Sequence, residues 1–88
     1  MEIRLLRNAE TQEAVRLIWE VFSEFEAPVY SAQGVEEFRM FLQNRVEMNA
    51  LRMYGAWADG QLTGVLAMRG AHIALFFVRK EWHRRGVG

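Results

Sequence analysis

Two different periods of apolar residues divide the chain near residue 50. In the first half, apolar side chains recur every three or four positions at Ala14, Ile18, Val21, Phe22 and Phe25. That spacing places them on one face of an α-helix. From residue 51 the period changes to two, which is typical of half-buried β-strands. The pattern therefore predicts helices in the first half and a β-sheet in the second.

A short strand and the start of a helix are expected at the N-terminus. Residues 2–7 are predicted to form the strand, with Ile3 and Leu5 on one face and Arg4 on the other. Asn8 or Thr11 then caps the helix, since both residue types accept hydrogen bonds from free backbone N–H groups at a helix start.

Pro28 interrupts the helical pattern, so residues 26–30 are expected to link two helices. Ser31 is a good N-cap, and the second helix is predicted to run from there to about Asn49. Its half-buried face carries Val35, Phe38, Phe41, Leu42, Val46 and Asn49. The aromatic residues Phe25, Tyr30 and Phe41 can wall a substrate pocket, although packing in the core is the favoured interpretation.

Three consecutive strands are predicted after residue 50. Asp59 and Gly60 form a tight-turn pair between two alternating segments, which indicates a β-hairpin. Gly70 and Ala71 make another short turn before an almost continuously apolar run at residues 73–78. Such a run is typical of a strand covered on both faces, so we expect it to be the central strand of the sheet.

Composition excludes several classes of protein. The 88 residues allow one domain, and 11 basic and 11 acidic residues cancel to a net charge of zero. A neutral chain offers no general attraction to nucleic acid or to a membrane surface, so neither partner is expected. The chain has no cysteine, which excludes disulfides and thiolate metal sites. With no membrane-spanning run and no signal-peptide pattern, we expect a cytoplasmic protein without a metal.

A basic, glycine-containing segment follows the last predicted strand. It includes Arg79, Lys80, Arg84 and Arg85, and it ends at Gly88. Free backbone N–H groups in such a loop bind anions, and glycines allow a ligand to approach the backbone closely. The segment therefore predicts a local anion site on an otherwise neutral chain.

The order strand, helix, helix, hairpin, apolar strand and glycine loop resembles the N-terminal half of the GNAT (Gcn5-related) N-acetyltransferases. The acetyl-CoA motif of that family is Gln/Arg-x-x-Gly-x-Gly/Ala after the fourth strand. The matching residues here are His83, Arg84, Arg85, Gly86, Val87 and Gly88, with His83 departing from the family pattern. The resemblance implies an α+β fold of the α/β three-layer type, with a mixed, mainly antiparallel sheet flanked by helices.

The resemblance also implies a co-substrate, acetyl-CoA. Backbone N–H groups between Arg84 and Gly88 would hold its pyrophosphate, and the arginine side chains would add charge-assisted contacts. The backbone of Phe76, Phe77 and Val78 would pair with the pantetheine arm as an added strand does. A solvated pair of terminal charges is the alternative interpretation of Arg84 and Arg85.

No catalytic residue is assigned from the sequence. In the family a substrate amine attacks the thioester carbonyl. The reaction requires a base to deprotonate the ammonium group of the substrate and an acid to protonate the leaving thiolate. His72, Glu24 and Glu26 are candidate bases, but a solvated surface role is favoured for each. In many family members a tyrosine protonates the leaving thiolate. It would lie beyond Gly88, and neither Tyr30 nor Tyr54 occupies its position.

The resemblance covers the whole chain but only the first half to three-fifths of a typical family domain. Residues 1–88 are therefore expected to form a single, incomplete acetyltransferase domain that is inactive alone. Strand 73–78 would then expose an apolar edge, through which a second copy or a complementing C-terminal half could pair. Two functions remain open: an N-acetyltransferase acting on a small-molecule or peptide amine, and a non-catalytic module for acyl-CoA binding or protein association.

Overall fold

The computed structural model describes residues 2–82. The chain forms strand β1 (Glu2–Leu5), helix α1 (Thr11–Phe25), helix α2 (Ala32–Gln43), the short helix α3 (Arg45–Asn49), and strands β2 (Arg52–Ala58), β3 (Gln61–Arg69) and β4 (His72–Val78). Single 3-10 turns lie at η1 (Asn8–Glu10), η2 (Ala27–Val29) and η3 (Lys80–Trp82). The predicted order of strand, two helices and three strands is confirmed, with one additional short helix.

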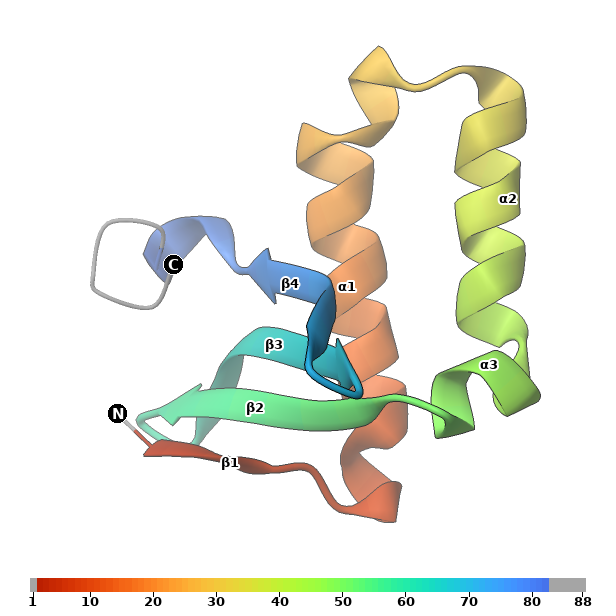
Figure 1. Cartoon of the computed structure of the whole chain (residues 1–88). Coiled ribbons are helices and arrows are strands. Elements are labelled where there is room, and N and C mark those ends of the chain that lie inside the picture. Colours follow the sequence, from red (N-terminus) through yellow and green to blue (C-terminus); the bar gives the residue numbers. More distant parts are fainter. Residues whose placement is uncertain (1, 83–88) are drawn as a thin grey trace.

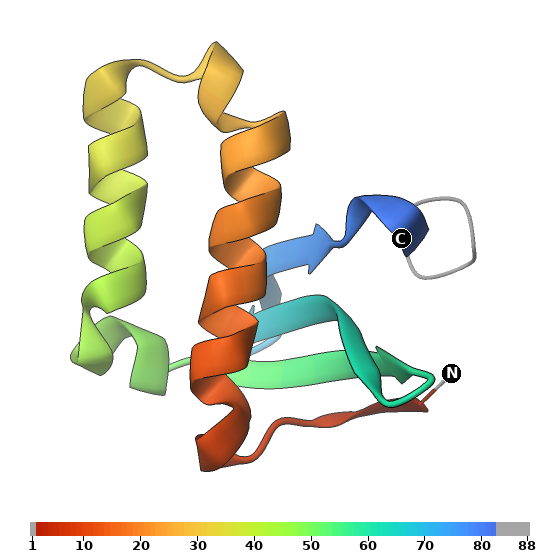
Figure 2. The same ribbon diagram turned by 180° about the vertical axis from the view of Figure 1, so that it is seen from behind.

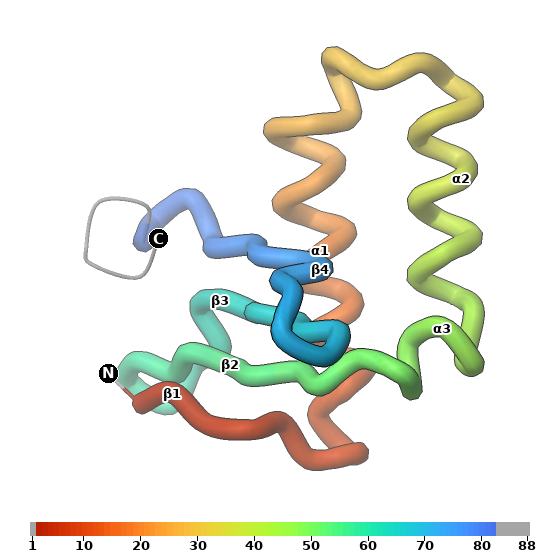
Figure 3. Tube along the Cα trace, in the orientation of Figure 1, coloured from red at the N-terminus to blue at the C-terminus, as the bar shows by residue number. Residues whose placement is uncertain are grey.

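The four strands of the described region form one antiparallel sheet in the order β1-β2-β3-β4. Helix α1 crosses one face of this sheet, and α2 runs beside α1 in the opposite direction (Figures 1 and 2). The start of β1 and the end of β4 lie toward the same side of the sheet (Figure 3). The α+β class expected from the sequence is confirmed.

The core lies between α1 and the sheet. On α1 the buried residues are Ala14, Leu17, Ile18 and Phe22, whereas Phe25, which the periodicity placed on this face, is 43% exposed. Phe22 stacks on Phe38 of α2 with ring centroids 4.1 Å apart, and Phe38 contacts Phe77 of β4 at 6.0 Å. This aromatic series links both helices to the last strand.

The predicted hairpin is confirmed. Asp59 and Gly60 connect β2 to β3 with positive φ angles of 54° and 77°, as a type I′ turn requires. The register then shifts between Ala56 and Trp57, which leaves Thr63 without a partner in β2. Thr63 is buried, and its hydroxyl donates to the Ala56 carbonyl at 3.0 Å. The buried hydroxyl at the bulge therefore has a hydrogen-bond partner within the hairpin.

The prediction that residues 73–78 form the central strand is wrong for the described region. Strand β4 pairs only with β3 and lies at the edge of the sheet, while β3 lies between β2 and β4. Leu75, Phe77 and Val78 are buried, but Ile73 and Phe76 are 63% and 51% exposed. A continuous apolar run is typical of a strand covered on both faces, yet here α1 covers only one.

The face of the sheet opposite α1 is also apolar. Register places Leu5, Tyr54, Leu66 and Phe76 in one row across the four strands. Leu5 is 53% exposed and Phe76 is 51% exposed. Within residues 2–82, this face therefore remains partly open to solvent.

Strand β1 and the start of α1 differ from the prediction. The strand ends at Leu5 rather than residue 7, and Leu6, rather than Ile3, packs against the core. Helix α1 begins at Thr11 without a side-chain cap from Asn8 or Thr11. Asn8 instead opens the 3-10 turn that leads into the helix.

The second predicted helix is broken in two. Ser31 caps α2 as expected, because its Oγ accepts a hydrogen bond from the Gly34 N–H at 3.0 Å. The helix stops at Asn44, where ψ is 106°, and the Asn44 side chain caps α3 by accepting from the Glu47 N–H at 3.0 Å. This break leaves Val46 82% exposed and buries Met48 instead.

The carboxylate of Glu10 ties β1 to the start of α1. It accepts hydrogen bonds from the Arg4 guanidinium at 2.9 and 2.8 Å and from the Arg7 N–H at 2.9 Å. The hydrogen bond from Arg4, with that from Arg7, lowers the pKa of Glu10 from 4.5 to about 2. Because this pKa is lower in the folded state, the carboxylate stabilises the fold above pH 4.5 and loses that effect as the pH falls toward about 2.

We predict that Glu10→Gln lowers stability at neutral pH and that its deficit relative to the parent protein shrinks as the pH falls from about 4.5 to about 2. Urea denaturation at a series of pH values measures this difference. Glu2→Gln is the matched control, because Glu2 lies farther from Arg4, at 3.7 Å. A deficit for Glu10→Gln that does not change with pH would contradict the prediction.

Adjacent phenylalanines of β4 provide a second test. Phe77→Ala should lower the free energy of unfolding by about 3–5 kcal/mol, since it removes a buried ring. Phe76→Ala, at the exposed neighbour, should change it by only about 0.5 kcal/mol. Equal losses in urea denaturation would show that the assigned faces of β4 are incorrect.

Candidate functional site

The end of β4 is held in place by Arg79. Its backbone N–H donates to the Thr63 carbonyl at 2.8 Å, and its Nε donates to the Leu62 carbonyl at 3.0 Å. Its Nη1 donates to Glu20 Oε2 of α1 at 2.7 Å. Arg79 thus connects the exit of β4 to the start of β3 and to α1.

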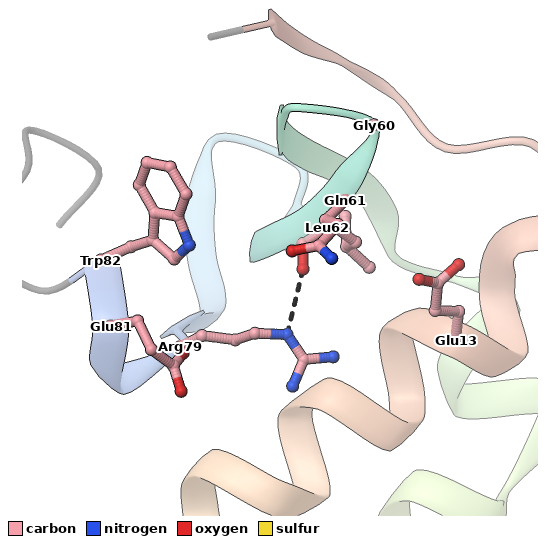
Figure 4. Close-up of a pocket in the computed structure, with 7 residues that line it drawn as sticks. All are labelled: Glu13, Gly60, Gln61, Leu62, Arg79, Glu81 and Trp82. Carbon is pink, nitrogen blue, oxygen red and sulfur yellow. Dashed lines mark hydrogen bonds between the residues drawn. The ribbon is translucent and has the colours of Figure 1, made fainter.

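A cleft of about 570 Å³ lies beside this exit, with Glu13, Gly60, Gln61, Leu62, Arg79, Glu81 and Trp82 around it (Figure 4). It contains the carboxylates of Glu13 and Glu81, and the charge of Arg79 is already paired with Glu20. This cleft is therefore a poor anion site by itself. The anion chemistry expected here depends on the motif residues that follow.

The motif residues His83, Arg84, Arg85, Gly86, Val87 and Gly88 lie outside the described part of the chain. The proposed backbone cradle for pyrophosphate stays a prediction from the sequence. The described structure does fix the point from which this segment starts. The turn Lys80–Trp82 closes with a hydrogen bond from the Trp82 N–H to the Arg79 carbonyl at 2.9 Å.

The other predicted binding residues, Phe76, Phe77 and Val78, form the end of β4. The Arg79 N–H faces β3, and backbone groups alternate along a strand. The N–H and C=O groups of Phe76 and Val78 therefore face the outer edge, whereas those of Phe77 face β3. Phe77 also places its ring in the core. Among the three, Phe76 has the backbone geometry that an added strand needs.

A second bulge lies earlier in β4. The register with β3 shifts between Ala67 and Met68, so Ala74 has no partner in β3. Bulges re-aim backbone groups and often lie beside functional sites. No local motif marks it in the sequence, because it depends on pairing with a strand in another segment.

The candidate acid–base residues do not converge. His72 is exposed at the start of β4, at the opposite end from Arg79. Glu24 lies 3.7 Å from Lys80 Nζ, and Glu26 ends α1. Tyr30 packs edge-on against Phe22 at 5.1 Å. Within residues 2–82 the candidate acid–base residues are therefore not brought together at one site.

Among residues 2–82, no group of three or more His, Cys, Asp or Glu side chains is placed to hold a metal ion. None of the helices in this region has both the length and the apolar character required to cross a bilayer.

Sequence reasoning missed the contact between Arg79 and Glu20. These residues are 59 positions apart, and each looks like an ordinary surface charge when read locally. Thr63 likewise lies within an alternating segment of the sequence, where nothing distinguishes it from its neighbours. The chain offers no short-range signal for either role, because both depend on how β3, β4 and α1 pack.

Several solved acetyltransferases have the same fold. The PaiA N-acetyltransferase of Thermoplasma acidophilum, in complex with coenzyme A, has a TM-score of 0.74 and 19% identity over 96% of this chain and 62% of its own. An acetyltransferase from Vibrio fischeri has a TM-score of 0.62 and 16% identity, over 99% of this chain and 76% of its own. The aminoglycoside 6'-N-acetyltransferase of Acinetobacter haemolyticus has a TM-score of 0.56 and 17% identity, over 99% of this chain and 63% of its own.

The chain therefore spans about three-fifths of the length of two of these structures and three-quarters of the third. No curated protein matches its sequence. The family model described as an acetyltransferase (GNAT) domain matches residues 26–88, which is most of the chain and includes β4 and the glycine motif. With the strand order and the motif position in agreement, the chain belongs to the GNAT acetyltransferase family.

Proposed function

We propose that the chain binds acetyl-CoA as the donor-binding part of a cytoplasmic N-acetyltransferase. The observation that carries this proposal is the position of β4, which among residues 2–82 pairs with β3 alone and leads within a few residues into the glycine motif. Residues 1–88 would form one domain that corresponds to the N-terminal part of a longer acetyltransferase. Coenzyme A in the complex of the Thermoplasma protein supports the choice of ligand.

In the proposed complex the chain recognises the donor mainly through its backbone. The backbone around Phe76, Phe77 and Val78 would pair with the amides of the pantetheine arm, as an added strand pairs with a sheet edge. N–H groups between Arg84 and Gly88 would hold the pyrophosphate, and the side chains of Arg84 and Arg85 would add charge. His83 would contribute through its position in the loop rather than through ring chemistry.

The reaction would transfer the acetyl group to an amine. The amine nitrogen attacks the thioester carbonyl, the C–S bond breaks, and the thiolate of CoA takes up a proton as the amine loses one. The names of two structural relatives indicate that they acetylate aminoglycosides, which are amine-bearing small molecules. We propose a small-molecule or peptide amine as the acceptor, without assigning the base or the acid.

Calorimetry with acetyl-CoA tests this function. The chain should show saturable binding, and Gly86→Val should abolish it, since a branched side chain would obstruct the approach of pyrophosphate to the loop. Gly70→Asn serves as the control, because its turn, with φ of 60°, tolerates asparagine and lies at the opposite end of β4. The absence of saturable heat with the unmodified chain would contradict the proposal.

Protein association is the second candidate function. It is favoured by the exposure of Ile73 and Phe76 on an edge strand, at 63% and 51%. A second copy or a complementing C-terminal segment would pair with β4 through the outward backbone groups that the donor would otherwise use.

We predict that the isolated chain self-associates and that Phe76→Lys shifts it toward the monomer, because charges on edge strands oppose pairing. Light scattering over a range of concentrations measures the change. Met40→Lys is the control, since Met40 is similarly exposed, at 58%, but lies on α2. A well-folded monomer at all concentrations would exclude association through β4.

A further inference from the structure

Arg79 occupies the junction between strand β4 and the proposed phosphate-binding segment. Its guanidinium bridges two elements by donating to the Leu62 carbonyl at 3.0 Å and to Glu20 at 2.7 Å. Its backbone N–H adds a bond to the Thr63 carbonyl at 2.8 Å. Figure 4 shows the side chain extending from the end of β4 toward Leu62 and α1.

The groups that hold Arg79 are themselves fixed. Thr63 is 1% exposed, and its hydroxyl is bonded to the Ala56 carbonyl at 3.0 Å. Glu20 lies on α1, the helix that carries the fully buried residues Ala14, Leu17, Ile18 and Phe22. One turn later on the same helix, Glu24 lies 3.7 Å from Lys80, the residue after Arg79. Consecutive residues at the exit of β4 therefore face acidic residues on successive turns of α1.

This arrangement requires an arginine in particular. The planar guanidinium reaches a carbonyl and a carboxylate at the same time, whereas a lysine ammonium presents a single centre on a flexible stem. The side chains of Arg79 and Glu20 are 31% and 51% exposed, so the ion pair by itself adds little to stability. Its main effect is geometric, because it fixes the direction in which the chain leaves the sheet.

We propose that Arg79, held by Glu20, is a positioning residue for the donor pyrophosphate. This inference rests on the proposed binding of acetyl-CoA. Neither side chain needs to touch the ligand. They hold the turn from which the glycine segment starts, which would lower the cost of ordering that segment when the ligand binds.

A positioning role predicts a loss that depends on the ligand. Arg79→Gln should weaken acetyl-CoA binding by on the order of tenfold, because the loop must then be ordered by the ligand. Arg79→Lys and Glu20→Gln should each give a smaller loss. Binding of S-acetylpantetheine, which lacks the pyrophosphate, should not change.

Calorimetry with acetyl-CoA and ligand-observed NMR with S-acetylpantetheine measure the two affinities, with thermal unfolding to establish that each variant is folded. Arg69→Gln is the matched control. Arg69 pairs with Glu47 of α3 at 3.3 Å, also between a strand and a helix, but it lies at the other end of β3. This variant should bind both ligands as the unmodified chain does.

The outcomes separate this inference from the proposed function. If the unmodified chain does not bind acetyl-CoA, the proposed function fails. If it binds and a folded Arg79→Gln variant binds equally well, the positioning role is wrong. Equal losses for both ligands, or for Arg79→Gln and Arg69→Gln, would also overturn it. Should Arg79→Gln not fold, Arg79→Lys and Glu20→Gln decide by the same criterion.

Discussion

The contact between Phe22 and Phe38 is the interaction on which the rest of the structure depends. Phe22 is fully buried on α1, and its ring lies 4.1 Å from that of Phe38 on α2. The ring of Phe38 in turn packs near that of Phe77 of β4, with ring centroids 6.0 Å apart. A small domain buries a limited share of its surface, so each large buried ring contributes strongly to the core. This series of rings holds the helices on one face of the sheet and fixes the inner side of β4.

With its inner side fixed, β4 can present its outer edge in a defined position. Backbone groups at a strand edge require no particular side chain, which would suit recognition of a ligand with amides of its own. Arg79 then fixes where the chain leaves the strand. If the proposed function is correct, core packing and donor binding are thus coupled through one strand.

Local sequence signals predicted much of the fold. The hairpin was correct because Asp59 and Gly60 both adopt positive φ, and the start of α2 was correct because Ser31 caps it. The break at Asn44 was missed, since an asparagine within a continuous apolar pattern also fits an exposed helix position. Strand β4 was placed at the centre because an apolar run does not reveal how many neighbours the strand has.

The sequence by itself determined the order of the elements, the turn types and the family, because these depend on periodicity and on residues close together in the chain. Tertiary structure decided that Leu17 rather than Phe25 is buried on α1, that Phe77 rather than Phe76 faces the core, and that Arg79 joins Glu20 across 59 positions. Which side chains come into contact depends on the register of β3 with β4 and on the position in which α1 packs against these strands. Both are set by the packing of the whole domain, which no local pattern encodes.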